Sequence, residues 1–210
     1  MEILRKAKWM LMLVFISLAM GKSLTAQDFK KVQEAFVASY SYENSKSYSK
    51  AIQALKQVYD AQSYEINIRL GWLYYNAGNY PESVSYYLKA IQLKPYSVEA
   101  RFGYALPASA LGNWNQVLDK YVEILKIDPN NYTANYRAGL IYYNRKEYSA
   151  AYRYFEKIAN MFPFDYDATH MYAWTNFRLG KLREAKVLFQ KTLLIKPGDS
   201  SATEGLGLIK

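Results

Sequence analysis

Few side chains in this sequence could carry out catalysis. His170 is the single histidine, cysteine is absent, and no paired carboxylates, glycine-rich phosphate loop or metal-ligand spacing occurs. Catalysis requires a positioned acid, base or nucleophile, so we predict that the chain is not an enzyme and uses no cofactor or metal. The sequence is rich instead in aromatic residues, with 22 Tyr, 9 Phe and 4 Trp. Such rings are common anchors in protein interfaces.

Evenly spaced prolines indicate the elements that would position these rings. The prolines, each 34 residues from the next, are Pro95, Pro129, Pro163 and Pro197. Two residues after each comes a side chain that can accept a hydrogen bond from the first turn of a helix. These residues are Ser97, Asn131, Asp165 and Asp199, and Ser63 extends the series backwards. We therefore predict that each proline ends one helix and that the next helix begins two residues later.

Small and large side chains recur at fixed places within this 34-residue unit. The small places hold Gly71, Ala105, Gly139 and Ala173, and then Ser83, Val117, Ala151 and Ala185. A complementary large place holds Tyr87, Tyr121, Phe155 and Phe189. A turn is marked by Gly78, Gly112 and Gly180, with Lys146 as the exception. Because the apolar spacing is helical, each unit should be two antiparallel helices in close contact.

A helix-turn-helix unit of this length and pattern resembles the tetratricopeptide repeat. The resemblance is carried by Leu70-Gly71, Tyr74, Ser83, Tyr87, Ala90 and Pro95 and by their equivalents in three further units. It implies an all-α fold, a right-handed α-solenoid of antiparallel helix pairs. Four units cover residues 64–199, a degenerate N-terminal repeat covers 27–63, and a truncated C-terminal capping helix covers 200–210.

The ends of the chain carry separate expectations. Residues 1–26 have the pattern of a signal peptide: a basic start, a dozen apolar residues from Trp9 to Met20, and small residues around Gly21 or Ala26, where cleavage would follow. The apolar run is too short for a permanent membrane span. A periplasmic or secreted protein is therefore expected.

The C-terminal end leaves two alternatives. Either segment 200–210 folds over Phe189, or this end joins another subunit and makes a homo-oligomer.

The charge distribution argues against nucleic acid as a partner. The formal net charge is +9, and the first 26 residues account for +3 of it. The remaining +6 is spread along the chain without a run of five like charges. A mildly basic, solvated surface explains this distribution better than a nucleic-acid site.

The resemblance also implies that the first helix of each unit lines a concave groove. Carried over place by place, the expected partner-binding residues, called here the groove row, are Ile68, Trp72, Tyr75, Asn76, Phe102, Leu106, Tyr136, Leu140, Tyr143, Asn144, His170, Trp174, Phe177 and Arg178. Most are aromatic or aliphatic. The packing places of the same helices are already filled by residues such as Leu70, Gly71 and Tyr74. We therefore expect four aromatic side chains to face a ligand rather than the core, namely Trp72, Tyr75, Tyr143 and Trp174.

Three functions fit these features. The first is an adaptor or scaffold of the cell envelope that binds a peptide segment of another protein in the groove. The second is a carbohydrate-facing protein in polysaccharide assembly, because Trp72, Tyr75, Tyr143 and Trp174 could stack on sugar rings. The third is a structural solenoid that self-associates through its C-terminal end. No feature of the sequence names the ligand.

Overall fold

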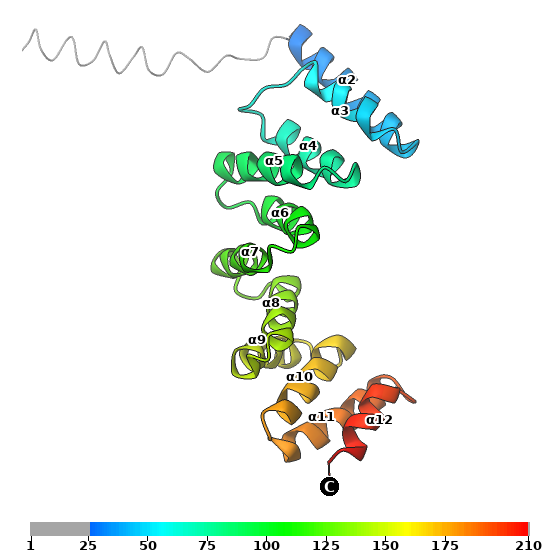
Figure 1. Cartoon of the computed structure of the whole chain (residues 1–210), viewed down its shortest axis with the longest axis vertical. Helices are drawn as coiled ribbons and strands as arrows, with labels where there is room; N and C mark the ends of the chain where they lie inside the picture. The colour runs from blue at the N-terminus through cyan, green and yellow to red at the C-terminus, as the bar shows by residue number, and fades with distance from the viewer. Residues whose placement is uncertain (1–25, 210) are drawn as a thin grey trace, which may run out of the picture. The chain divides into compact units, whose positions relative to one another are not determined.

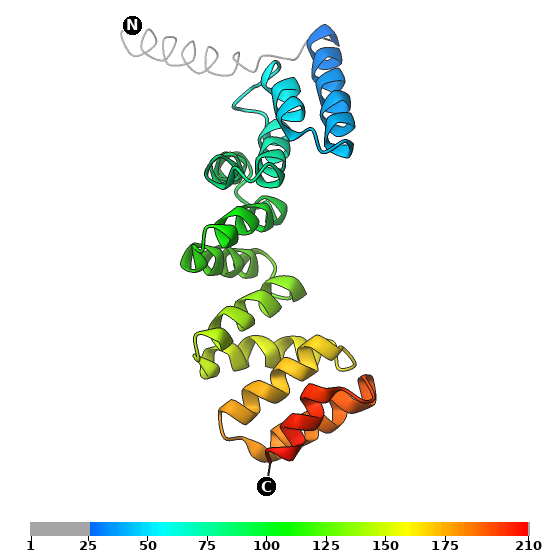
Figure 2. The same ribbon diagram turned by 45° about the vertical axis from the view of Figure 1, so that its right-hand side comes forward.

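The computed structural model describes residues 26–209, and all its regular elements are helices. The chain divides between Tyr59 and Asp60 into two compact units, which are described separately below (Figures 1 and 2). The predicted signal peptide lies outside the described residues, apart from Ala26 at the start of the first helix. Within the described range, no helix is both long enough and apolar enough to cross a membrane.

The first unit is one helix pair, α2 (Ala26–Asn44) and α3 (Tyr48–Lys56). Ser39 and Ala51 are fully buried in this pair, as is Leu55. Between the helices, Lys46 adopts a left-handed conformation with φ of 57°. The pair is thus built like the units that follow, although α3 has only nine residues.

The second unit contains nine helices within its described residues. They are α4 (Tyr64–Asn76), α5 (Tyr80–Leu93), α6 (Val98–Ala110), α7 (Trp114–Ile127), α8 (Tyr132–Asn144), α9 (Tyr148–Met161), α10 (Tyr166–Arg178), α11 (Leu182–Ile195) and α12 (Ser200–Gly207). The first helix of each of the four repeats has 13 residues and the second has 14. Each helix packs on the next one along the chain, and α4 also contacts α6. The predicted all-α solenoid of helix pairs is confirmed.

Five side chains cap the helices at the predicted places. Ser63, Ser97, Asn131, Asp165 and Asp199 each accept a hydrogen bond from the backbone N–H three residues later. Such a bond satisfies one of the four N–H groups that a helix leaves unpaired in its first turn. The 34-residue period therefore comes from caps as well as from apolar packing.

The turns inside the repeats share one left-handed residue. Gly78, Gly112 and Gly180 have φ between 74° and 78°, and Lys146 has φ of 62° at the same place. Glycine adopts this conformation readily, whereas a side chain at this φ costs about 1 kcal/mol or more. The third repeat thus keeps the turn geometry of the others with a residue poorly suited to it.

Close approach of helices explains several glycines. A Cβ atom added at Gly71 would lie 2.9 Å from the ring of Tyr87, and one at Gly139 would lie 2.8 Å from the ring of Phe155. These are contacts within a repeat. Gly103 instead meets the same Tyr87 from the following repeat, where a Cβ would lie 2.1 Å from the ring. One aromatic ring therefore holds two successive first helices together.

The C-terminal segment covers the last repeat. Phe189 is fully buried, and a Cβ added at Gly205 of α12 would lie 2.3 Å from its ring. Gly205 looks like a weakness in a capping helix if helix propensity alone is considered. The structure shows that Gly205 occupies the place that Gly103 has three repeats earlier. The absence of a side chain there makes room for the Phe189 ring, as Gly103 makes room for that of Tyr87. Of the two alternatives left open for this end, the structure shows the one in which the segment folds over Phe189.

Candidate partner-binding surface

The groove row differs from its neighbours in exposure. None of its fourteen members is buried, since ten are half-buried and Trp72, Leu106, Asn144 and Arg178 are exposed. In the same helices Leu70, Ala105, Ala138 and Ala173 are buried. The first helices therefore send one set of side chains into the core and leave the groove row at least partly accessible over α4, α6, α8 and α10. Seven members of the row also pack against the edges of the core clusters, namely Ile68, Phe102, Tyr136, Leu140, Tyr143, Trp174 and Phe177.

Aromatic contacts organise the row near its N-terminal end. The ring centroids of Trp72 and Tyr75 lie 6.1 Å apart, and those of Tyr75 and Tyr80 lie 5.8 Å apart. Asn76 donates a side-chain hydrogen bond to the carbonyl oxygen of Trp72. Rings that pack against one another lose fewer conformations when a ligand binds, which favours binding.

The middle of the row is aromatic and aliphatic. Tyr136 packs edge-on against the buried ring of Phe155 at 6.0 Å, and Tyr143 packs in the same way against Tyr148 at 5.3 Å. Phe102 lies 6.1 Å from Tyr121. Arg178 donates a hydrogen bond of 3.4 Å to the Tyr143 hydroxyl, which links the third and fourth repeats along the row.

Trp174 and His170 hold the end of the row to α12. The indole N–H of Trp174 donates to Ser201 Oγ at 2.9 Å, and His170 Nε2 lies 2.8 Å from the same oxygen. The Trp174 ring also packs edge-on against Phe189 at 5.0 Å. The expectation that Trp174 points away from packing contacts is therefore wrong, because α12 supplies a partner for it. The Trp174 ring therefore serves mainly to pack α10 against α11 and α12 and leaves little ring surface for a ligand.

Burial and hydrogen bonds shift the pKa values of His170 and Asp199 in this corner. Burial lowers the pKa of His170, although Asp199 and Asp167 partly oppose that shift. The imidazole is accordingly neutral at pH 7, and one of its nitrogens can accept a hydrogen bond. Burial alone would raise the pKa of Asp199, but hydrogen bonds from Tyr166, from the Ala202 N–H and from Lys196 outweigh it and lower the pKa to about 2.

Three tyrosine hydroxyls form contacts between repeats that were not predicted from the sequence. The hydroxyl of Tyr132 donates to Asp165 at 2.5 Å and that of Tyr166 donates to Asp199 at 2.7 Å, while that of Tyr64 lies 2.7 Å from Ser97 Oγ. Each tyrosine is the first residue of its helix and reaches the cap of the next repeat. Val98 occupies the equivalent place in α6 and has no hydroxyl. The 34-residue spacing of these tyrosines was the signal that could have revealed them.

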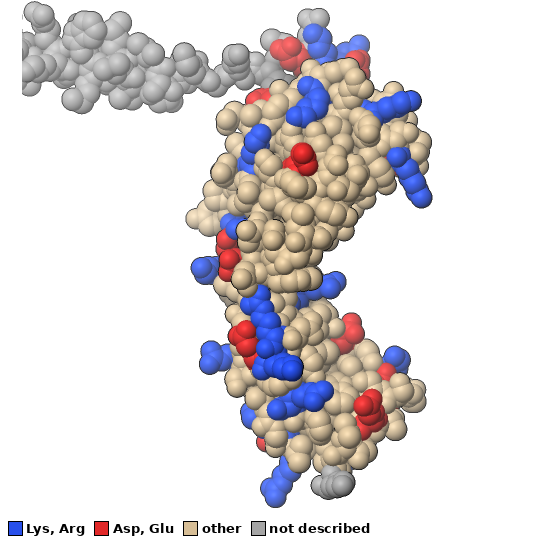
Figure 3. Space-filling model, in the orientation of Figure 1, with Lys and Arg blue, Asp and Glu red and all other residues tan. Residues whose placement is uncertain are grey.

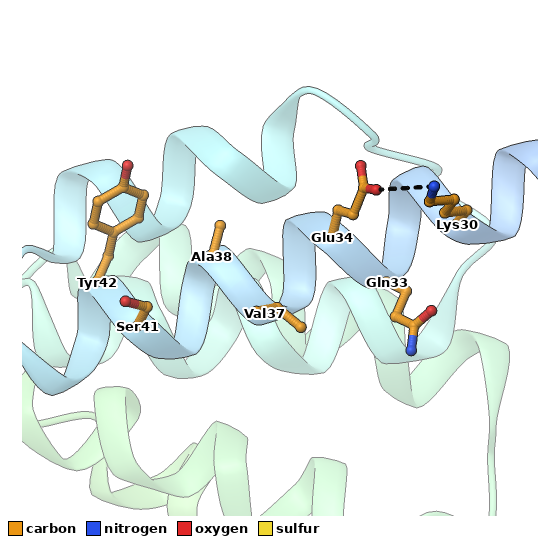
Figure 4. A pocket seen from close by; sticks show the side chains of 7 residues that line it. All are labelled: Lys30, Gln33, Glu34, Val37, Ala38, Ser41 and Tyr42. Atoms are coloured by element: carbon orange, nitrogen blue, oxygen red, sulfur yellow. Dashed lines mark ion pairs between the residues drawn. The ribbon is translucent and has the colours of Figure 1, made fainter.

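The first unit has a separate depression on the surface of α2. It has a volume of about 600 Å³ and is lined by Lys30, Gln33, Glu34, Val37, Ala38, Ser41 and Tyr42. Figure 4 shows that all seven side chains come from this one helix. Lys30 and Glu34 form an ion pair of 4.0 Å at its edge. Such an exposed pair stabilises a protein little, and the depression contains no member of the groove row.

Ring contacts, helix caps and hydrogen bonds account for the side-chain interactions of this surface. Within residues 26–209, no group of three or more His, Cys, Asp or Glu side chains could hold a metal ion. Tyr132 and Asp199, whose pKa values are shifted, take part in a contact between repeats and in a cap, and Glu123 bonds Arg101 within the second repeat. Aromatic side chains dominate the accessible face of the first helices.

Comparison with known families agrees with the geometry. Residues 64–97 and residues 100–166 match family models of the tetratricopeptide repeat. The chain is a tetratricopeptide repeat protein. A TPR repeat-containing protein of Methanocaldococcus jannaschii is 34% identical over 96 residues, which are 46% of this chain. The match spans only 17% of that relative's length.

Solved tetratricopeptide repeat structures show the same fold. The crystal structure of MamA superposes with a TM-score of 0.70 at 20% identity, covering 80% of this chain and 92% of MamA. A tetratricopeptide repeat protein of Parabacteroides merdae gives 0.72 at 21% identity, covering 84% of this chain and 71% of that one. The tetratricopeptide repeat is a protein-interaction fold and generally non-enzymatic. The chain is accordingly assigned as a protein-interaction scaffold.

Proposed function

We propose that this scaffold works in the cell envelope and binds a peptide segment of a partner protein along the groove row. The supporting observation is the exposure pattern of the first helices, which bury one set of side chains and leave fourteen others accessible. Tetratricopeptide repeats stack to form extended binding surfaces, and an extended or helical segment matches such a surface in length. The envelope location rests on the signal-peptide pattern of residues 1–26.

The composition of the row suits a peptide with apolar side chains. Burying one large apolar side chain is worth about 2 kcal/mol, and the cost of association is subtracted from the total, so a partner segment needs several such contacts along the row. The sugar-stacking alternative needs open ring faces. Trp174 is engaged with Ser201 and Phe189, which leaves Trp72, Tyr75 and Tyr143 for that role. The contacts of α12 likewise give the self-association alternative no added support.

Affinity capture from an envelope extract tests the proposal. The parent chain is compared with Trp72→Ala/Tyr143→Ala and with the control Val187→Ala/Leu194→Ala, whose residues are 62% and 75% exposed on α11. We expect one protein to be retained by the parent and by the control but lost from the groove variant. Helical content and unfolding midpoints must stay the same in all three. Equal recovery by all three chains would rule out the groove row as the binding surface.

A further inference from the structure

A second cleft lies in the second unit, on a different face of α8 from the groove row. It has a volume of about 470 Å³. It is lined by Val122, Leu125, Lys126, Pro129, Asn135, Tyr142, Ala150, Arg153, Tyr154 and Lys157, called here the basic cleft. Asn135 and Tyr142 are about two turns apart on one side of α8, whereas Tyr136 and Tyr143 project about 100° further round. The basic cleft and the groove row have no residue in common.

The charge of the basic cleft is entirely positive. Lys126 comes from α7, Arg153 and Lys157 come from α9, and no lining residue is acidic. Within residues 26–209, none of the three cations forms an ion pair with a carboxylate. Arg153 and Lys157 are four residues apart on one helix, where like charges repel each other. In the region of α8 and α9, Figure 3 shows basic side chains close together, with an acidic group beside them.

The preceding repeat shows how the equivalent cleft is neutralised. Glu123, 34 residues before Lys157, accepts a bond of 2.9 Å from Arg101 and one of 2.6 Å from Lys120. Burial alone would raise the pKa of the Glu123 carboxyl, but the bonds from Lys120 and Arg101 outweigh it and lower that pKa. Asp119 likewise stands 34 residues before Arg153. Two carboxylates in one repeat are thus replaced by two cations in the next.

Asn135 completes this exchange. It takes the place that Arg101 has one repeat earlier. Asn135 donates a hydrogen bond to the carbonyl oxygen of Asn131, and Arg101 donates one to the carbonyl oxygen of Ser97, in each case four residues earlier. Arg101 extends further to Glu123, whereas the shorter Asn135 does not reach the equivalent region. The basic cleft, at about 470 Å³, is therefore larger than the equivalent cleft of the preceding repeat. That cleft, which Glu123 and Lys120 line, has a volume of about 340 Å³.

The remaining walls are apolar and aromatic. Tyr142 and Tyr154 stack with centroids 5.5 Å apart and planes 14° from parallel. Val122 and Leu125 are half-buried and pack against the core of the second and third repeats. A ligand would therefore meet ring faces and aliphatic side chains between the three cations. That combination accommodates a chain bearing both carboxylates and an apolar side chain.

We propose that the basic cleft binds an acidic segment of a partner protein, whose carboxylates take the place that Glu123 holds one repeat earlier. Positive side chains without internal partners attract such a segment and orient it. Nucleic acid fits less well, because three cations in one short cleft neutralise few phosphates. The chain would then carry two binding surfaces for two kinds of segment, apolar for the groove row and acidic for the basic cleft.

Fluorescence anisotropy of labelled peptides tests this assignment on the whole chain. The probe is Glu-Leu-Glu-Glu-Tyr-Glu-Leu-Glu, and its counterpart has Gln at every Glu. The cleft variant is Arg153→Glu/Lys157→Glu. The control is Arg183→Glu/Lys186→Glu, which changes the net charge equally at exposed places of α11. We expect the cleft variant to bind the acidic probe at least tenfold more weakly than the parent, with the control within twofold.

Four results would overturn the proposal. They are failure of the parent to bind the acidic probe, equal binding of the Gln peptide, equal losses in both charge-reversed variants, or a DNA duplex that competes more strongly than the acidic probe. If charge reversal alters the unfolding midpoint, Arg153→Gln/Lys157→Gln replaces the cleft variant. Because Trp72→Ala/Tyr143→Ala should leave this binding unchanged, the test does not depend on the groove row.

Discussion

At the residue scale, two glycines of α12 have opposite roles. Gly205 faces the buried ring of Phe189, whereas nothing lies within 4 Å of a Cβ placed at Gly207. Both glycines weaken a helix by about 1 kcal/mol relative to alanine when they lie in its interior. Only the first has a contact that requires the absence of a side chain.

We predict that Gly205→Ala destabilises the C-terminal end and that Gly207→Ala does not. The Gly205 substitution should cost about 1–3 kcal/mol through overpacking against a rigid ring. The Gly207 substitution should be neutral or slightly stabilising, because this residue ends the helix. Chemical unfolding of the two variants measures the difference. Equal effects on the unfolding midpoint would contradict the packing of α12 on Phe189.

Asp199 should make the stability of this end depend on pH. Its pKa is about 2 in the folded chain, against an ordinary 3.8, so its contribution is present above about pH 4 and is lost as the pH falls toward 2. The contribution should be about 1 kcal/mol, less than the full shift implies because Lys196 is exposed to water. Asp199→Asn keeps a capping oxygen but does not titrate.

Unfolding of the parent and of Asp199→Asn at pH 5 and pH 2.5 measures this contribution. The parent should be more stable than the variant at pH 5, and the difference in their free energies of unfolding should be smaller at pH 2.5. Comparison with the variant separates Asp199 from other carboxylates that titrate in the same range. A gap that stays the same at both pH values would show that Asp199 has no such role.

At the element scale, the turn of the third repeat stores strain. Lys146 has the left-handed conformation that glycine supplies at three equivalent places. Lys146→Gly should therefore stabilise the chain by about 1 kcal/mol, since the backbone geometry is kept and the steric cost is removed. The matched variant Gly112→Lys should cost a similar amount. A lower unfolding midpoint for Lys146→Gly would mean that the lysine side chain makes a contact that outweighs the strain.

Periodic features of these elements could be predicted from the sequence. The proline spacing with Ser97, Asn131 and Asp165 predicted the helix starts, because a cap acts within its own first turn. The exposure of the groove row follows from the same periodicity. The tyrosine contacts between repeats were not predicted, although Tyr132 and Tyr166 share the same 34-residue period.

Contacts that occur only once could not be predicted in this way. Ser201 binds His170 and Trp174, which are 31 and 27 residues distant, and no other repeat has a histidine at that place. The contact depends on how α12 packs against α10, and a single sequence does not encode that register in a repeated pattern. The positive charge of the basic cleft likewise could not be predicted from the sequence, because its three cations come from two helices and form no run of like charges.

At the scale of the whole molecule, the second unit combines nearest-neighbour stability with an extended surface. Rings such as Tyr87 and Phe189 hold one repeat to the next, and in three cases a tyrosine hydroxyl does so as well. In such arrays stability is roughly a sum of repeat and interface contributions. The groove row runs across these interfaces, and its half-buried members combine packing contacts with partly accessible surface that can serve binding.

Site-specific photo-crosslinking in cells tests the role of the groove row most directly. A benzoylphenylalanine is placed in the whole chain at Leu106, a groove-row residue that is 40% exposed, or at Leu194 on α11, which is 75% exposed. We predict a defined crosslinked protein from position 106, absent from position 194 and lost on adding Trp72→Ala/Tyr143→Ala. The same product from both positions, or none from position 106, would contradict the proposal that the groove row binds the partner.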